Sequence, residues 1–204
     1  MPAIFIPPDK LKRLIRRRRR SGADRYDEVW DGVYVMSPLA NFEHQVIGTR
    51  LAAAFIQALP ESSNQSISAG ANISDRLHGW TKNYRVPDVV VFLPGNPARI
   101  LETHAVGGPD FAVEVISRGD RSREKFDFYA KVGVRELLLV DRSPWSLELY
   151  RHDGTKLVQA GSFLVGDSKP IESKVLPVSF RLIETEERPK VEVTQNEDRR
   201  VWLA

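Results

Sequence analysis

The sequence predicts a mixed α/β (α+β) fold with one central mixed β-sheet flanked by helices and a β-hairpin near the N-terminus. Residues 26–36, YDEVWDGVYVM, contain two β-rich runs joined by Asp31-Gly32, a dipeptide typical of two-residue hairpin turns. Residues 41–59 carry apolar side chains at helical spacing. Residues 110–141 read as strand, helix and strand, which predicts a right-handed crossover between two parallel strands.

The remaining elements follow from the same periodicities. Asn41 is a suitable N-cap for the helix over 41–59, and Pro60 ends that helix. A second helix is expected over 120–132, capped by Gly133, with inward-facing Phe126, Tyr129, Ala130 and Val132. Apolar or alternating runs predict strands over 65–74, 85–93, 110–117, 135–141, 146–151, 156–165 and 175–183.

The 204 residues suffice for one domain. We expect a basic N-terminal arm over 1–22, the domain over 23–183, and a polar C-terminal tail over 184–204 that is loose or docks through Trp202. Cysteine is absent, which excludes disulfides and zinc–thiolate sites and suits a cytoplasmic location. No apolar run approaches the roughly 20 residues of a membrane span, so no membrane association is expected.

Positive charge is concentrated at the N-terminus. Residues 1–20 hold eight Lys or Arg and one Asp, a formal charge of +7, whereas the rest holds 22 basic and 26 acidic residues, a charge of −4. Five consecutive arginines, Arg16 to Arg20, would neutralise phosphates if nucleic acid lay nearby. A solvated, partly helical tail explains the run equally well.

Two expected strands carry an acid among apolar residues. Asp88 precedes the apolar end of RVPDVVVFL, and Glu114 interrupts DFAVEVIS. If the strands are neighbours, the two carboxylates converge at one end of the sheet and repel unless a cation lies between them. Oxygen ligands without cysteine or paired histidine favour Mg²⁺ or Mn²⁺ over zinc. The pattern therefore predicts a metal site at Asp88 and Glu114.

Basic residues follow Glu114 closely. Lys125 opens the next expected helix, which would carry its ammonium to the same end of the sheet, where it could orient or help deprotonate a water and stabilise a developing phosphorane. Arg118, Arg121 and Arg123 lie in the intervening loop and are candidate contacts to backbone phosphates. A solvated loop is the alternative for these arginines.

Each site residue also has an ordinary structural interpretation. Glu114 could form a structural ion pair with Arg85, Arg118 or Lys125, and Asp88 could cap a turn after Pro87. His44, beside a helix start, is interpreted as an ordinary surface residue. The metal site is favoured because Asp88, Glu114 and Lys125 occur together and in order.

In this combination of motifs the sequence resembles the Uma-two family of "putative restriction endonucleases", part of the PD-(D/E)XK nuclease superfamily. The resemblance rests on Pro87-Asp88, Glu114, the lysine-bearing helix, GVRELLLVD, the hairpin DEVWDGVYVMSP and the helix beginning FEHQVIGTRL, and it spans residues 26–151. It implies a restriction-endonuclease-like fold and metal-dependent hydrolysis of phosphodiesters, with DNA as the expected substrate and a homodimer as a plausible assembly for cutting two strands.

The resemblance also implies roles for individual residues. Asp88 and Glu114 match the metal-binding acids, and Lys125 matches the catalytic lysine, because Ile116 occupies the superfamily's usual lysine position. Glu43 matches a first-helix acid that supports the metal through water, although a helix-dipole role is an equal alternative. The loop SRGDRSRE is shorter than the family's usual loop. Two rival functions remain: a non-catalytic nucleic-acid-binding module, and a partner-binding protein with a decayed site.

Overall fold

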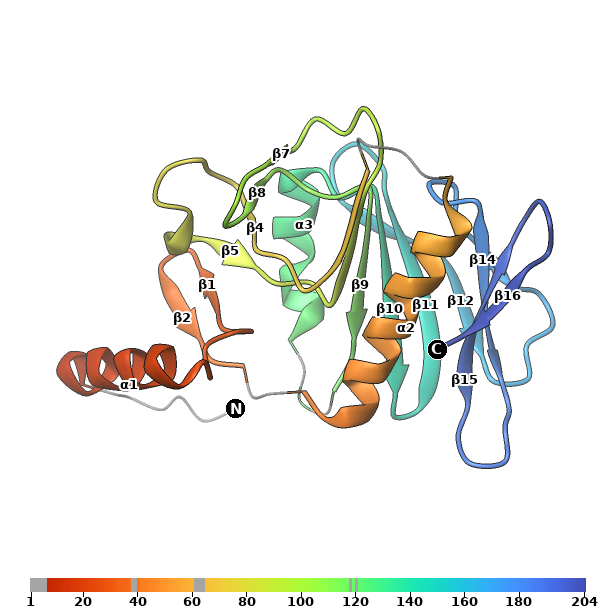
Figure 1. Cartoon of the computed structure of the whole chain (residues 1–204), viewed down its shortest axis with the longest axis horizontal. Helices are drawn as coiled ribbons and strands as arrows, with labels where there is room; N and C mark the ends of the chain where they lie inside the picture. The colour runs from red at the N-terminus through yellow and green to blue at the C-terminus, as the bar shows by residue number, and fades with distance from the viewer. Residues whose placement is uncertain (1–6, 38–39, 61–64, 118, 120) are drawn as a thin grey trace.

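The structure, a computed structural model, describes residues 7–37, 40–60, 65–117, 119 and 121–204. Its centre is a six-stranded sheet with the order β12-β11-β10-β9-β6-β3 (Figure 1). Its strands β9 and β10 are parallel and its other pairs are antiparallel, which confirms the predicted mixed sheet and parallel pair. The strands are β3 (Ser66–Ala69), β6 (Val89–Phe92), β9 (Phe111–Val115), β10 (Glu136–Arg142), β11 (Trp145–His152) and β12 (Leu157–Leu164).

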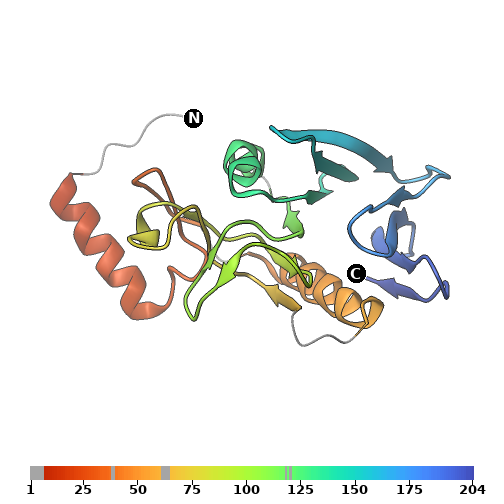
Figure 2. The same ribbon diagram turned by 90° about the horizontal axis from the view of Figure 1, so that it is seen from above.

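Helices α2 (Phe42–Ala58) and α3 (Phe126–Val132) lie on opposite faces of this sheet (Figure 2). Successive strand residues face opposite sides, so Val89 packs with the α2 cluster and Val90 with the α3 cluster. The Asn41 side chain accepts from the His44 N–H, which confirms the predicted N-cap. A 3₁₀ turn, η2 (Ser122–Lys125), precedes α3, so Lys125 ends this turn instead of opening an α-helix as predicted.

The predicted hairpin belongs to a second sheet, with the order β2-β1-β5-β4-β8-β7. Its turn residues Asp31 and Gly32 have φ values of 47° and 88°, the positive angles that a tight hairpin turn of this kind requires. A 3₁₀ turn, η1 (Trp80–Lys82), precedes β5. The strands of this sheet are β1 (Glu28–Trp30), β2 (Val33–Val35), β4 (Ile73–Ser74), β5 (Tyr84–Arg85), β7 (Arg99–Ile100) and β8 (Ala105–Val106).

Two predicted strands each divide between the two sheets. The run over 65–74 bends at Gly70, whose φ of 72° suits glycine, and its halves become β3 and β4. The run over 85–93 breaks at Pro87, which has no N–H for a sheet hydrogen bond, and its halves become β5 and β6. As a result, Asp88 lies immediately before β6, where the two sheets meet.

The prediction that residues 184–204 form a loose polar tail is wrong. Residues in this range form β15 (Lys190–Gln195) and β16 (Val201–Leu203). Together with β13 (Ile171–Glu172) and β14 (Val178–Ile183) they make a third sheet with the order β13-β14-β15-β16. Val191 and Val193 are fully buried in the core that includes α2, because they alternate with polar residues along β15. The Trp202 indole donates to Gln57 of α2, as the docking alternative predicted.

Helix α1 (Pro8–Ser21) occupies most of the expected N-terminal arm and ends at Gly22, which has a φ of 68°. It lies at the opposite end of the molecule from the C-terminal sheet (Figures 1 and 2). Within the part of the chain that the structure describes, no helix is long and apolar enough to cross a membrane.

Candidate active site

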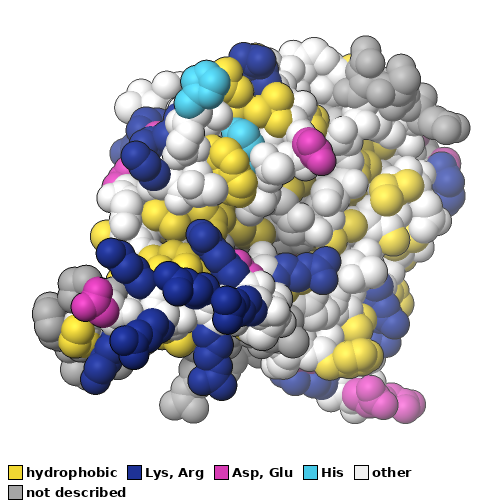
Figure 3. All heavy atoms as spheres, turned by 60° about the vertical axis from the view of Figure 1, so that its left-hand side comes forward, with side chains coloured by type: hydrophobic (Ala, Val, Ile, Leu, Met, Phe, Trp, Pro, Cys, Tyr) yellow, Lys and Arg dark blue, Asp and Glu magenta, His cyan; other side chains and the backbone are white. Residues whose placement is uncertain are grey.

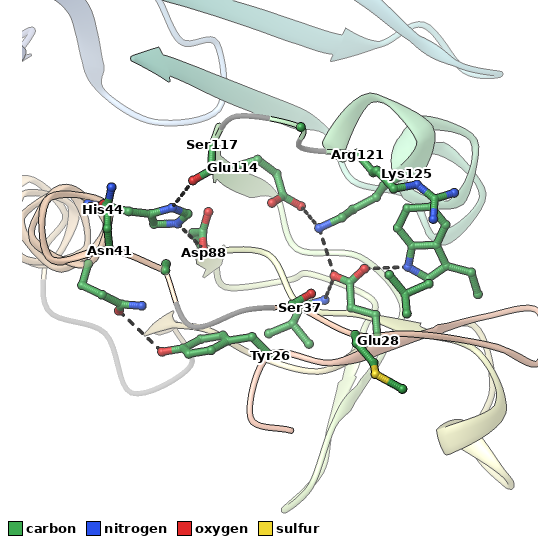
Figure 4. A pocket seen from close by; sticks show the side chains of 17 residues that line it. Tyr26, Glu28, Ser37, Asn41, His44, Asp88, Glu114, Ser117, Arg121 and Lys125 are labelled. Carbon is green, nitrogen blue, oxygen red and sulfur yellow. Dashed lines mark hydrogen bonds and ion pairs between the residues drawn. The ribbon is translucent and has the colours of Figure 1, made fainter. Parts of the chain in front are cut away.

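A pocket of about 400 Å³ lies where the hairpin, α2, the start of β6 and the end of β9 come together (Figure 4). Asp88, Glu114 and Lys125, three of the predicted site residues, line it. Residues far apart in sequence therefore meet because the strand breaks at Pro87 and because η2 returns the chain over the end of β9.

Asp88 and Glu114 come from neighbouring strands, at the start of β6 and near the end of β9. The register of these strands ends at the pair of Val89 with Val113, so Asp88 and Glu114 each lie one residue beyond it. The Asp88 N–H donates to the Val113 carbonyl at 3.0 Å, and the Val115 N–H donates to Asp88 Oδ2 at 2.7 Å. Both acids line the same pocket.

Glu114 is only 3% exposed and its carboxylate is well supplied with donors. Its Oε1 accepts from Lys125 Nζ at 2.9 Å and from the Tyr129 hydroxyl, and its Oε2 accepts from Ser122 Oγ at 3.3 Å. Burial raises the pKa of Glu114, Lys125 opposes this rise, and the charge of Asp88 adds to it. The Lys125 contact matches the structural ion pair that the sequence allowed as an alternative.

A second buried acid, Glu28 of β1, shares the same lysine. Lys125 Nζ lies 3.0 Å from Glu28 Oε1, and Glu28 also accepts from the Val86 N–H at 2.7 Å and the Trp30 indole at 2.6 Å. Burial alone would lower the pKa of Lys125, but Glu114 and Glu28 raise it above its ordinary value, so the ammonium stays charged. Nothing in the hairpin pattern separates Glu28 from Asp27, so the sequence alone does not indicate Glu28 as a site residue.

His44 is buried, contrary to its interpretation as a surface residue. Its Nε2 lies 2.9 Å from Asp88 Oδ1, at an angle outside hydrogen-bond geometry, and its Nδ1 lies 3.2 Å from Ser117 Oγ. Asn41 caps the start of α2, which places His44 against the start of β6. His44 and Ser117 are thus further site residues, and only the proximity of a helix start to the sheet edge could have indicated them.

Glu43 does not line the pocket. Its carboxylate forms ion pairs with Arg142 at 2.7 Å and with Arg188 at 3.0 Å. Arg142 also donates to Ser117 Oγ at 3.0 Å, so Glu43 reaches the site only through Arg142. This position favours the structural interpretation of Glu43 over the expected role beside a metal.

The three loop arginines differ from one another. Arg118 lies outside the described residues. Arg121 lines the pocket, with its guanidinium 4.5 Å from the Trp30 ring centre and a paired Glu124 at its outer side. Arg123 does not line the pocket and instead pairs with Glu148 at 2.8 Å. Of the described arginines predicted to contact phosphate, only Arg121 is therefore beside the candidate site.

Comparison with known proteins places this geometry in a family. The Uma2 family model, described as "Putative restriction endonuclease", matches residues 10–185. The chain belongs to the Uma2 family. The match confirms the resemblance that the hairpin, the first helix, Asp88, Glu114 and the lysine-bearing helix indicated.

Among solved structures, this Uma2 chain is similar to the crystal structure of a "putative nuclease" belonging to DUF820 from Anabaena variabilis. The two share 17% sequence identity with a TM-score of 0.58, and the match covers 73% of this chain and 83% of that chain. At this identity the likeness shows a shared fold. No curated protein matches the chain.

The donor set of the Uma2 chain suits a hard cation. The pocket is lined by three acids, Asp88, Glu114 and Glu28, against two basic side chains, Lys125 and Arg121, so the acids outnumber the bases by one. No cluster of three or more metal-ligating side chains arranged around one point exists among the described residues. Mg²⁺ commonly needs just one or two carboxylates, with water and substrate phosphate completing its shell, so Asp88 and Glu114 fit it better than they fit zinc.

Proposed function

We propose that this protein is a metal-dependent endonuclease that hydrolyses phosphodiester bonds of DNA, with Mg²⁺ or Mn²⁺ held by Asp88 and Glu114. The observation that carries the proposal is the convergence of these two acids beside a charged lysine in one pocket. Membership of the Uma2 family supports a nuclease-type activity. The ion would supply a polarised phosphoryl oxygen and a bound water of lowered pKa.

The protein's own residues would orient the reacting groups. Glu114 and Glu28 occupy two of the three N–H donors of Lys125, and the third remains for a water or a phosphate oxygen in the pocket. Because its pKa is raised, Lys125 would act as a charged donor that stabilises negative charge, and the alternative role as a base is disfavoured. His44, whose Nε2 lies 2.9 Å from Asp88 Oδ1, would limit the movement of that carboxylate.

The test is cleavage of supercoiled plasmid and of labelled DNA and RNA duplexes with Mg²⁺, Mn²⁺ or EDTA. Asp88→Asn and Glu114→Gln should each lower the metal-dependent rate by at least about 100-fold, and Lys125→Met by roughly 100-fold. Cleavage that persists in all three variants, or that proceeds in EDTA, would contradict the site assignment.

Asp110→Asn is the matched control. Asp110 is a buried acid immediately before β9, at the opposite end of the strand from the pocket, where it accepts from the Leu93 N–H and pairs with Arg135. Its loss should lower stability without lowering the rate per folded molecule. Thermal unfolding of every variant separates loss of chemistry from loss of fold.

A non-catalytic nucleic-acid-binding module is the second candidate, and one observation favours it. Both Glu114 oxygens already accept hydrogen bonds from protein donors, so the acid is satisfied without a metal. This function predicts DNA binding that EDTA does not change and no cleavage under any metal condition. A single metal titration of binding and cleavage distinguishes the two candidates.

A further inference from the structure

Helix α1 presents a dense basic surface at the end of the molecule that carries the pocket. Figure 3 brings this end forward and shows Lys and Arg side chains gathered over the helix. Seven of its eight basic side chains are exposed, namely Lys10, Lys12, Arg13, Arg16, Arg17, Arg19 and Arg20. We call residues 8–21 the arginine helix.

Six of these seven side chains lack a carboxylate partner among the described residues, and four of the six lie together. Arg13, Arg16, Arg17 and Arg20 line one shallow groove together, and none of them lies within ion-pair distance of a described carboxylate. They recur at three- and four-residue spacing, which brings like charges together on one side of a helix and destabilises it when nothing compensates. A polyanion laid along the groove would remove this repulsion.

The eighth basic residue, Arg18, anchors the helix instead. Its guanidinium donates to both Asp27 oxygens, at 2.6 and 2.5 Å, and the Asp27 side chain is completely buried. The Tyr34 hydroxyl also donates to Asp27 at 2.5 Å, so the contact joins α1 to both strands of the hairpin region. The Arg18–Asp27 ion pair therefore holds the arginine helix against the hairpin, and the helix does not extend as a free arm.

The anchor also links the helix to the rim of the pocket. Asp27 accepts from the Ser37 N–H at 2.8 Å and Arg18 donates to the Ser37 carbonyl at 3.0 Å, and Ser37 lines the pocket. Along the same rim, Arg25 stacks on Tyr26, another lining residue, with its guanidinium 5.9 Å from the ring centre. The arginine helix is thus tied to the pocket lining through Ser37.

We propose that the arginine helix is a docking surface for the phosphate backbone of duplex DNA, which it holds beside the pocket. This inference rests on the proposed nuclease function for its choice of ligand. A helix of 14 residues is roughly 21 Å long and would follow about six base pairs of duplex. Contacts of this kind position the duplex without reading its sequence.

The experiment measures binding of a fluorescent 30-base-pair duplex to the full chain in EDTA, where the proposed chemistry is off, over a series of salt concentrations. The test variant replaces Arg13, Arg16, Arg17 and Arg20 by Gln. The control variant removes the same charge elsewhere, by Gln at exposed Lys156, Lys169, Lys174 and Arg199 in the β11–β12 turn and around the C-terminal sheet. The test variant should bind at least about tenfold more weakly, with a salt slope shallower by about 3, and the control should bind like wild type.

A third variant tests the anchor. Arg18→Gln keeps the four groove arginines but removes the Asp27 contact, so it should weaken binding although the groove charges remain. Any of three results would overturn the inference. The test variant could match wild type in affinity and salt slope, the control variant could bind as weakly as the test variant, or wild type could fail to bind the duplex at 50 mM salt. If the test variant binds DNA like wild type and metal-dependent cleavage is present, the inference fails but the proposed function stands. If binding depends on the arginine helix but no cleavage occurs, only the proposed function fails.

Discussion

Two buried glutamates on neighbouring parallel strands, Glu114 and Glu136, have opposite electrostatic settings. Glu136 begins β10 and is fully buried, with Arg151 at 2.7 Å from its Oε1 and Ser173 Oγ at 2.5 Å from its Oε2. One acid thus meets one base. Glu114, near the end of β9, shares Lys125 with Glu28 and also faces the charge of Asp88.

Burial of a charge therefore does not by itself indicate a functional site. Glu136 is balanced, hydrogen bonded and outside the lining of the active-site pocket, where its bonds to Ser173 and the Lys174 N–H tie the central sheet to the C-terminal segment. Glu114 belongs to a group with more acids than bases and opens onto a pocket. Such an imbalance costs stability, and binding of a cation or substrate would remove that cost.

The largest expected difference between the two glutamates is in stability. Glu136→Gln should lower the free energy of unfolding by about 2 kcal/mol, because it breaks a buried pair whose partner Arg151 is 28% exposed. Glu114→Gln should change it by less than about 1 kcal/mol, because it relieves repulsion with Glu28 and Asp88. Urea denaturation measures both values. Equal losses would show that the two acids have the same structural role.

The gain in stability from bound metal should depend on the pocket acids and not on Glu136. At a Mg²⁺ concentration ten times its dissociation constant, wild-type protein should gain about 1.4 kcal/mol of stability, or about 4 °C in Tm. The gain should persist in Glu136→Gln and disappear in Asp88→Asn. Differential scanning fluorimetry with Mg²⁺ and with an equal concentration of NaCl measures it, and a shift that survives Asp88→Asn would contradict the proposed ligand.

Removing one hydrogen-bond donor from each glutamate gives a smaller effect. Tyr129→Phe and Ser173→Ala should each cost about 1 kcal/mol of stability, since each leaves a buried carboxylate with one donor fewer. Only Tyr129→Phe should change the cleavage rate, by about tenfold, because its hydroxyl fixes Glu114. A matching change of rate in Ser173→Ala would show that rate follows stability alone.

A partly buried acid, Asp75, provides the smallest effect and a test by pH. Hydrogen bonds from Arg76 lower the pKa of Asp75 despite its burial, and Lys131 contributes in the same direction. A pKa lowered by folding stabilises the protein above the unfolded value of about 3.9, and this stabilisation is lost as pH falls below it. Asp75→Asn should therefore lower Tm by about 2 °C at pH 7, because the partners are exposed, and the difference should close below about pH 4.

Local signals in the sequence were sufficient for much of the fold. The hairpin turn at Asp31-Gly32, the cap at Asn41 and the paired apolar runs around α3 act over a few residues, so they survive in any tertiary context. The two divided strands and the C-terminal sheet were missed for the opposite reason. Whether Pro87 ends a strand or only bends it, and whether Val191 and Val193 find a partner strand, depends on residues far away in the chain.

The candidate site divides in the same way. By itself the sequence indicated Asp88, Glu114 and Lys125, because the three occur together and in the order of the family motif, although each alone has an ordinary structural interpretation. Only the tertiary structure shows that Glu28, His44 and Ser117 line the pocket. It also shows that Glu43 and Arg123 form ion pairs outside the pocket. Side-chain charge is a property of the residue, whereas the partner that balances it is set by packing between distant segments.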